Sequence, residues 1–205
     1  MTDKLILHED ARSGNCYKIR LTAALLGLPL EVRGYDIMAG ETRTREFLEA
    51  VNANGRIPVL QIDERFLPES SAACWYLSEG TPLLPDDRFG RADCLRWMFF
   101  EQYNHEPNIA TLRFWLRFVG EANLTDAQRA MIPAKRAAGL AALQLMEDHL
   151  AGHDWFVGEG VTLADIALYP YTHKAEAGGF PLEDFPRVCG WIKRIEQLPG
   201  YTPMA

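Results

Sequence analysis

Residues 54–71 read NGRIPVLQIDERFLPESS. The apolar run at 58–62 and the shorter one at 66–67 predict two strands, because turn-forming or charged residues bound each of them. The three residues between the runs leave room only for a tight turn, so we expect the strands to be antiparallel neighbours. The stretch then predicts the start of a helix at Glu69, and Gly80 marks the end of that helix.

The residues before this hairpin alternate between strand and helix patterns. Short apolar runs at 5–7 and 30–37 predict strands, and the spacing of apolar residues predicts helices over 16–26 and 44–51. A helix that connects two strands of one sheet implies that these strands are parallel. The sequence therefore predicts an α/β domain with the element order β-α-β-α-β-β-α.

The rest of the chain has helical patterns throughout. We expect the α/β domain over residues 1–80, a proline-bracketed linker over 81–87, and an all-helical domain over 88–205. The expected helices of that domain lie at 88–118, 126–150, 163–177 and 185–198. Pro107 should kink or interrupt the first of them, and Pro133 is expected near the start of the second.

A capping-box pattern precedes the third of these helices. Thr162 and Asp165 have the S/T-x-x-D spacing, in which the hydroxyl accepts the Asp165 N–H and the carboxylate accepts the Thr162 N–H. We interpret this pair as structural, and losing Thr162 should cost about 0.5–2 kcal/mol.

The composition excludes several classes of protein. The 205 residues carry a formal net charge of −7 and both halves of the chain are acidic, which argues against bulk nucleic-acid binding. No apolar run reaches the roughly 20 residues that span a bilayer, and the N-terminus lacks a secretion signal pattern. The four cysteines show no CxxC spacing, which excludes the commonest zinc patterns and suits a reducing compartment. We therefore expect a cytoplasmic protein with no membrane partner and no metal site.

The first candidate for chemistry is the helix start at residues 12–20, RSGNCYKIR. Free backbone N–H groups and the positive end of a helix dipole favour an anion there and would lower the pKa of a thiol such as Cys16. Structural interpretations stay open beside this one. Ser13 or Asn15 can simply cap the helix, and Cys16 can be a small buried apolar residue.

Two further candidates lie in the opening stretch. If the Ile57–Pro58 bond is cis, the backbone of Ile57 turns outward and can pair with an extended peptide; otherwise Pro58 simply begins a strand. At the next helix start, Ser70 and free N–H groups can hold a carboxylate while Glu69 holds an ammonium. Together these groups suit an α-amino acid head group. The alternative is an ordinary helix cap with an acidic first turn.

In this order, the segments RSGNCYKIR, NGRIPVL and ESSA, followed by a helical half, resemble a cytosolic glutathione S-transferase. The pattern is similar to that of the bacterial, serine-type, zeta- or theta-like classes and covers essentially the whole chain. The resemblance implies a thioredoxin-like domain followed by an all-helical domain, with glutathione as co-substrate and no metal. It also implies a small electrophile as second substrate, a homodimer and a role in detoxification.

The resemblance assigns roles to individual residues. It implies a cis bond before Pro58, a backbone at Ile57 that pairs with the cysteinyl part of glutathione, and a γ-glutamyl site at Glu69 and Ser70. Ser13 matches the position whose hydroxyl hydrogen-bonds the glutathione sulfur. In omega-type classes this position is Cys and the chemistry is thiol–disulfide exchange, so the serine favours conjugation.

One departure bears on thiol activation. Asn15 and Cys16 replace the Cys-Ser of the zeta-type stretch, so Ser13, Asn15 and Cys16 all stay catalytic candidates. Arg56 is the cation that we expect beside a glutathione carboxylate. Other functions stay open: a glutathione-dependent isomerase resembling maleylacetoacetate isomerase, a thiol-exchange enzyme, or a non-catalytic interaction module.

The electrophile is expected between the two domains, where pockets often form. Tyr103, His105, Arg113 and Trp115 come from the first long helix, and the aromatic side chains suit a flat or apolar electrophile. For aromatic residues of this helix the alternative is packing in the core, and for His105 it is a structural role.

Overall fold

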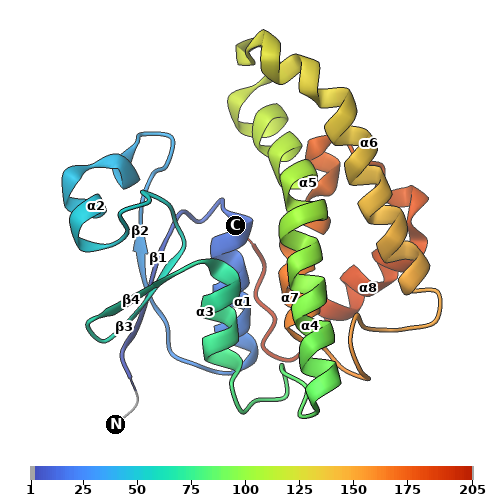
Figure 1. Cartoon of the computed structure of the whole chain (residues 1–205), viewed down its shortest axis with the longest axis horizontal. Helices are drawn as coiled ribbons and strands as arrows, with labels where there is room; N and C mark the ends of the chain where they lie inside the picture. The colour runs from blue at the N-terminus through green and yellow to red at the C-terminus, as the bar shows by residue number, and fades with distance from the viewer. Residues whose placement is uncertain (1–2, 205) are drawn as a thin grey trace. The chain divides into compact units, whose positions relative to one another are not determined.

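The computed structural model of the chain describes residues 3–204 (Figure 1). Contacts between Cα atoms divide the chain into two compact units. One comprises the residues up to Leu84 together with the segment from Leu198, and the other spans Pro85–Gln197. The division falls inside the linker expected at 81–87. The last residues, expected in the helical domain, instead belong to the first unit.

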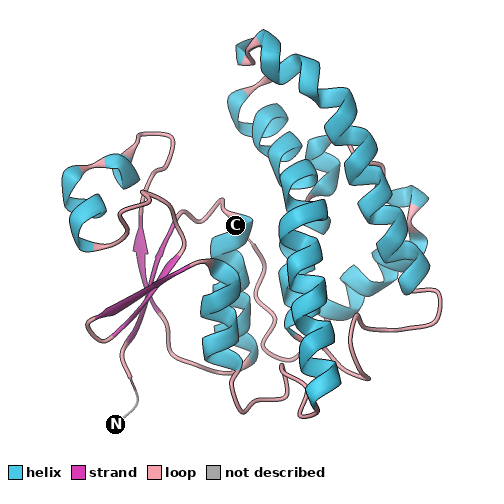
Figure 2. Ribbon diagram, viewed as in Figure 1, coloured by secondary structure: helices cyan, strands magenta, loops and turns pink. Residues whose placement is uncertain are grey.

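The first unit contains a four-stranded mixed sheet. Its elements are β1 (Leu5–Glu9), α1 (Gly14–Leu25), β2 (Glu31–Gly34), the 3₁₀ turn η1 (Glu41–Arg43), α2 (Arg45–Ala50), β3 (Val59–Ile62), β4 (Arg65–Pro68) and α3 (Ser70–Ser78). The strand order is β2-β1-β3-β4, with β1 parallel to β2 and the other two pairs antiparallel. Figure 2 shows the strands in magenta. This thioredoxin-like arrangement confirms the predicted β-α-β-α-β-β-α order.

Different helices cover the two faces of the sheet. α1 and α3 lie side by side against one face, and α2 lies across the sheet from them (Figure 1). Because side chains alternate along a strand, neighbouring residues of β1 point to opposite faces. Glu9 reaches Arg20 of α1 at 3.0 Å, so His8 points toward the α2 side. Leu7 and Leu60, paired in register, are fully buried in the core.

The C-terminal segment packs on α1. The Tyr17 hydroxyl donates to the carbonyl oxygen of Thr202 at 2.6 Å. Gly200 has a φ of 84°, and a Cβ there would lie 2.8 Å from the carbonyl oxygen of Ala24. Glycine therefore allows the two backbones to approach closely. These contacts explain why the last residues belong to the first unit.

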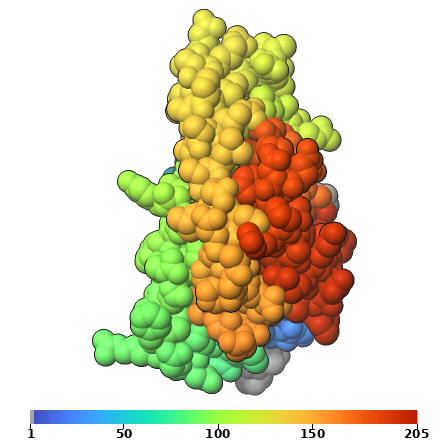
Figure 3. Space-filling view, turned by 90° about the vertical axis from the view of Figure 1, so that its right-hand side faces the viewer, coloured from blue at the N-terminus to red at the C-terminus, as the bar shows by residue number. Residues whose placement is uncertain are grey.

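The second unit is helical. Its elements are α4 (Arg88–Phe100), the π-helical turn η2 (Glu101–His105), α5 (Glu106–Arg113), the π-helical turn η3 (Phe114–Val119), η4 (Glu121–Asn123), α6 (Asp126–His149), α7 (Leu163–Thr172), η5 (Ala175–Gly178), η6 (Leu182–Asp184) and α8 (Pro186–Glu196). α6, yellow to orange, runs along the face seen in Figure 3, and α8 packs beside it. Trp97, Phe156 and Trp191 meet edge to face at the centre of the core. The all-helical prediction for this part of the chain is confirmed.

Pro107 changes the hydrogen bonding of the first long helix without ending it. Just before it, the N–H of Glu106 bonds to the carbonyl of Glu101, five residues earlier, which is π-helical bonding. Pro107 then falls in the first turn of α5, where a missing N–H costs least. The expected interruption is therefore a local change of helix type. Pro133 lies well inside α6, which continues past it.

Both hydrogen bonds of the predicted capping box are present between Thr162 and Asp165. The helix that they start is shorter than predicted: α7 ends at Thr172, and the 3₁₀ turn η5 follows. Among residues 3–204, no helix has the length and apolar character needed to cross a membrane.

Candidate functional site

Ser13 is the N-cap of α1, directly after the loop that follows β1. Its backbone is extended, and its Oγ accepts the N–H of Cys16 at 3.4 Å. Its own N–H donates to the carbonyl oxygen of Asp10 at 2.9 Å. The Ser13 hydroxyl also hydrogen-bonds the Cys16 thiol, which acts to lower the pKa of that thiol. One serine thus caps the helix and places a hydroxyl group at its N-terminus.

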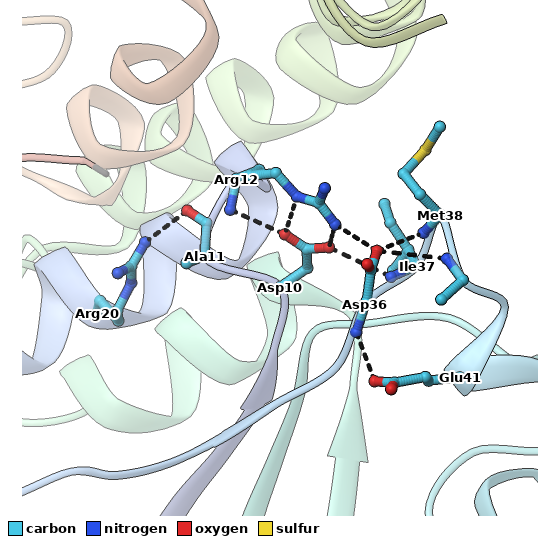
Figure 4. A network of polar contacts seen from close by, with 9 residues as sticks. Asp10, Ala11, Arg12, Arg20, Asp36, Ile37, Met38 and Glu41 are labelled. Atoms are coloured by element: carbon cyan, nitrogen blue, oxygen red, sulfur yellow. Dashed lines mark hydrogen bonds and ion pairs between the residues drawn. The ribbon is translucent and has the colours of Figure 1, made fainter.

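An ion-pair network anchors the loop that carries Ser13 (Figure 4). The Arg12 Nε and Nη2 atoms donate to the two oxygens of Asp10 at 2.8 and 2.5 Å, and Nη2 also reaches Asp36 at 2.6 Å. Asp36 in turn accepts the N–H of Met38 at 2.9 Å. Burial alone would raise the pKa of Asp10, but its hydrogen bonds from Arg12 hold that pKa below the usual value. One guanidinium therefore ties together the loops that follow β1 and β2.

Arg20 of α1 holds the same loop from another side. Its Nε lies 3.0 Å from Glu9 Oε2, and its Nη2 donates to the carbonyl oxygen of Ala11 at 3.2 Å. Burial raises the pKa of Glu9, while the charge of Arg20 acts to lower it. Sequence reasoning assigned no role to Arg12 or Arg20, because the partners on β1 and after β2 are distant in the sequence.

The N-termini of α1 and α3 meet through one side-chain hydrogen bond. Ser70, the first residue of α3, is 5% exposed, and its Oγ donates to Asn15 Oδ1 at 3.3 Å. Asn15 is the second residue of α1. The first N–H groups of both helices therefore lie at the same edge of the unit, together with the positive ends of both dipoles. This arrangement favours an anionic ligand.

Glu69 precedes α3 with an unusual backbone. Its φ of 72° and ψ of 114° lie in a region that residues other than glycine rarely adopt, at a cost of roughly 1–3 kcal/mol. The side chain is exposed and makes no capping hydrogen bond. A strained residue of this kind is typical of a ligand-binding position, and the carboxylate is available to a cation.

The Ile57–Pro58 peptide bond is cis, as the resemblance implied. Ile57 is half-buried, and among residues 3–204 no hydrogen bond uses its backbone N–H or C=O. Arg56 beside it is exposed, and in that same range its guanidinium has no partner. Both residues can therefore accept contacts from a ligand.

Cys16 is fully buried, with 0% of its surface exposed. Burial raises the pKa of its thiol to about 12, and the hydrogen bond with Ser13 opposes this only in part. The thiol is therefore protonated at neutral pH, although it lies in the first turn of a helix. These findings favour packing over a nucleophilic role for Cys16. None of the four cysteines forms a disulfide, and no group of described side chains could hold a metal ion.

The four residues predicted to contact an electrophile differ in their exposure and in their surroundings. Tyr103 is 85% exposed. His105 is fully buried and its Nε2 lies 2.9 Å from the Thr172 hydroxyl, which agrees with the structural interpretation of this histidine. Arg113 is 8% exposed, and burial lowers the pKa of its guanidinium. Trp115 lies at the wall of a cavity.

That cavity lies in the helical unit and has a volume of about 390 Å³. It is lined by Gln102, Glu106, Pro107, Ala110, Thr111, Phe114, Trp115 and Tyr171. Sequence reasoning missed Thr111 and Tyr171. The sequence does contain a signal for Thr111: it lies four residues after Pro107 and four before Trp115, and residues at this spacing share a helix face.

The profile of the glutathione S-transferase N-terminal domain matches residues 12–79, and that of the C-terminal domain matches residues 112–199. Human glutathione S-transferase theta-2 is 31% identical over 190 residues, which cover 85% of this chain and 73% of the human protein. The transcriptional regulator URE2 of Saccharomyces cerevisiae is 25% identical over 234 residues, covering 96% of this chain and 65% of the yeast protein.

Solved structures agree with these sequence matches. The crystal structure of a glutathione S-transferase from Pseudomonas fluorescens has a TM-score of 0.92 and 42% identity, and the match covers 98% of each chain. The sequence profiles, the human relative and this structure all point to the same family. The chain belongs to the glutathione S-transferase family.

Proposed function

We propose that this protein conjugates the thiolate of glutathione to small, apolar electrophiles. The observation that carries the proposal is the hydrogen bond between Ser70 and Asn15, which brings together two helix N-termini, one of them capped by Ser13. Such a site provides several N–H and O–H donors for one anionic ligand. Family membership supports glutathione as that ligand.

The chemical step is attack by sulfur on an electrophilic carbon. A C–S bond forms, the leaving group departs with its electron pair, and the thiol proton passes to solvent before the attack. The Ser13 hydroxyl and the helix dipole stabilise the thiolate, so the thiol loses its proton more easily at neutral pH. Ser13 acts as a hydrogen-bond donor in this step, because a serine hydroxyl stays protonated.

The remaining contacts bind the tripeptide. The γ-glutamyl carboxylate is assigned to Ser70 and the start of α3, and its ammonium to the exposed Glu69. The unused backbone of Ile57 is assigned to the cysteinyl residue, with which it can pair as in strand addition. Arg56 is assigned to a carboxylate of glutathione.

The electrophile is assigned to the 390 Å³ cavity of the helical unit. Phe114 and Trp115 form apolar walls, while Thr111 and Tyr171 bring hydroxyl groups to it. A small aromatic electrophile with one or two hydrogen-bonding substituents suits this lining.

We further propose that the protein is a cytoplasmic homodimer with a role in detoxification. An apolar stripe on the first long helix supports the dimer: Leu95, Phe99 and Tyr103 are 37%, 69% and 85% exposed at a spacing of four residues. A second copy of the chain would cover this stripe. Four cysteines without a disulfide support a reducing compartment.

Two measurements test the proposed reaction. Isothermal titration should show glutathione binding, and absence of binding at millimolar glutathione would contradict the proposal. Ser13→Ala should then lower turnover with 1-chloro-2,4-dinitrobenzene by at least tenfold, with a smaller loss of glutathione affinity. The pH profile of kcat should move to higher pH, because the thiol is harder to ionise. Cys16→Ala should keep the wild-type profile, since that thiol is buried.

The same experiments separate the alternative functions. The similarity to a transcriptional regulator is the reason to test for a non-catalytic interaction module. Such a module would bind glutathione without turnover of any electrophile. A thiol-exchange enzyme would reduce mixed disulfides and lose that activity in Cys16→Ala. The burial of Cys16 and the serine at position 13 both favour conjugation over exchange.

A further inference from the structure

A second cavity lies in the first unit, on the face of the sheet that α2 covers. Its volume is about 240 Å³, and strands β1, β2 and β4 together with α2 line it. Figure 1 shows α2 across the sheet from α1 and α3, so this cavity is on the other side of the sheet from these two helices.

Two polar side chains that line this cavity, His8 and Tyr35, belong to a hydrogen-bonded chain that continues to Gln61. Gln61 Nε2 donates to the carbonyl oxygen of Asp63 at 2.8 Å, which turns its Oε1 toward His8 Nε2 at 3.0 Å. His8 Nε2 must then carry a proton, so Nδ1 accepts the hydroxyl proton of Tyr35 at 2.9 Å. Burial lowers the pKa of His8, which keeps the ring neutral at pH 7. The interior of the cavity is therefore uncharged.

Aromatic rings surround this neutral interior. The ring of Tyr35 stacks on His8 with centroids 5.7 Å apart and meets Phe47 edge to face at 4.9 Å. Phe66 lies 5.7 Å from His8 and is 38% exposed, so apolar surface remains uncovered at the cavity. A flat ring would cover it and gain contacts with several side chains.

Two opposite charges lie at the same cavity. Arg33 on β2 and Glu46 on α2 both line it, and both are exposed. Within residues 3–204, neither side chain takes part in an ion pair or a hydrogen bond. Both charges act on the Tyr35 hydroxyl: burial raises its pKa most, Arg33 acts to lower that pKa, and Glu46 acts to raise it. A positive and a negative group thus flank one hydroxyl without neutralising each other.

We propose that this cavity binds a small aromatic zwitterion of the α-amino acid class. The aromatic ring enters between Phe47 and Phe66, the carboxylate meets Arg33, and the ammonium meets Glu46 and a lone pair of the Tyr35 oxygen. The volume is below the range typical of drug-sized ligands, which suits a molecule of this size. A ligand with only one charge would leave one rim group without a partner.

Three probes of one shape test the charge requirement. L-phenylalanine, phenylacetate and 2-phenylethylamine are titrated into the full chain, and binding is followed by calorimetry and by the NMR signals of the His8 ring. L-phenylalanine should bind most tightly, and each singly charged probe two- to fivefold more weakly, as expected for exposed charge pairs. No shift of the His8 signals with any of the three at 20 mM would overturn the proposal.

Variants locate the site. Arg33→Gln should weaken L-phenylalanine binding two- to fivefold and leave 2-phenylethylamine unchanged, and Glu46→Gln should do the reverse with phenylacetate unchanged. Glu49→Gln is the matched control on α2, because Glu49 is 4.0 Å from Arg45 and does not line the cavity. Equal affinities in all three variants would contradict the proposal.

Glutathione itself carries an amino acid head group, so its site must be distinguished from this one. L-phenylalanine should bind with unchanged affinity in the presence of saturating glutathione and in the Ser70→Ala variant. Competition with glutathione, or loss of binding in Ser70→Ala, would place the probe at the α3 N-terminus and refute the second site. Because these readouts need no turnover, they stand whether or not the proposed transferase activity is found.

Discussion

Asp165 and Trp191 are joined in the helical unit by a 2.8 Å hydrogen bond from the indole N–H to the carboxylate, and both side chains are 0% exposed. The same carboxylate accepts the N–H of Thr162 at 2.9 Å and that of Phe156 at 3.1 Å. One side chain at the start of α7 therefore connects that helix to α8 and to the loop before it.

Replacing this carboxylate should destabilise the fold. In Asp165→Asn an NH₂ group stands where one acceptor oxygen was, so at least one buried N–H loses its partner. The free energy of unfolding in urea should fall by roughly 1–3 kcal/mol. Asp148→Asn on the surface of α6 is the control and should change it by less than about 0.5 kcal/mol. Similar losses in the two variants would show that the buried network contributes nothing specific.

The same residue predicts a pH dependence of stability. Burial raises the pKa of Asp165 from 3.8 to about 6, so between these values the folded chain holds more of this proton than the unfolded chain. Stability from this group is then present at low pH and falls as pH rises through 4 to 6. Asn does not titrate, so the stability gap between wild type and Asp165→Asn should be larger at pH 4.5 than at pH 7. Urea unfolding of both proteins at pH 4.5 and at pH 7 measures this gap. A gap that is larger at pH 7 would contradict the raised pKa of Asp165.

Ser70 and Ser71 provide a matched pair of variants with which to test the proposed glutathione site. Ser70 donates to Asn15, whereas the buried hydroxyl of Ser71 has no hydrogen-bond partner in the described chain. Ser70→Ala should weaken glutathione binding about tenfold, because Asn15 loses the hydrogen bond that orients it and the ligand carboxylate loses a hydroxyl group that can rotate toward it. Ser71→Ala should bind as wild type does. Calorimetry gives both constants, and equal effects would remove Ser70 from the site.

Replacing Glu69 by glycine should stabilise the fold and weaken glutathione binding at the same time. Glu69→Gly relieves the strain of a positive φ and should raise the free energy of unfolding by about 1 kcal/mol. Glu69→Ala removes the same carboxylate but keeps the strain, so it should bring no gain. Both variants should bind glutathione more weakly. Unfolding curves that are the same for the two variants would show that the backbone at this position is not strained.

A substitution at Arg12 should lower the proposed activity indirectly, through the loop that carries Ser13. Arg12→Lys keeps the charge but loses the planar fork that spans Asp10 and Asp36, so the loop before Ser13 should loosen. We expect kcat to fall severalfold, with about 1–2 kcal/mol lost in stability. Arg45→Lys, at an exposed pair 4.0 Å long, is the control. Wild-type kcat in Arg12→Lys would show that the network has no positioning role.

The sequence was sufficient for the order of the elements because each strand and helix carries its own local pattern. The hairpin at 58–67 and the capping box at Thr162 depend on residues within a few positions of each other, and the structure has both. Helix α1 begins at Gly14, earlier than the predicted 16, since Ser13 rather than a later residue is the cap. Local chemistry is therefore visible in the sequence to within a few residues.

The site was only partly predictable because its geometry depends on distant partners. The pairing of Ser70 with Asn15 joins residues 55 positions apart, and no spacing rule indicates it. The position of Cys16 at a helix start suggested a low thiol pKa, but burial by the rest of the unit has the larger effect. Burial of this kind is a property of the whole fold and has no local signature.

The π-helical turn at Glu101–His105 also determines the direction in which all later side chains of the same helix point around the helix axis. Each inserted residue rotates later side chains by about 100° around the helix axis relative to a regular α-helix. The faces presented by Thr111 and Trp115 are therefore set by a backbone feature one to three turns earlier. Deleting a single residue of that turn should restore regular α-helical bonding and turn both side chains off the cavity wall. The width of one helical turn thus determines which residues of α5 and η3 line the cavity.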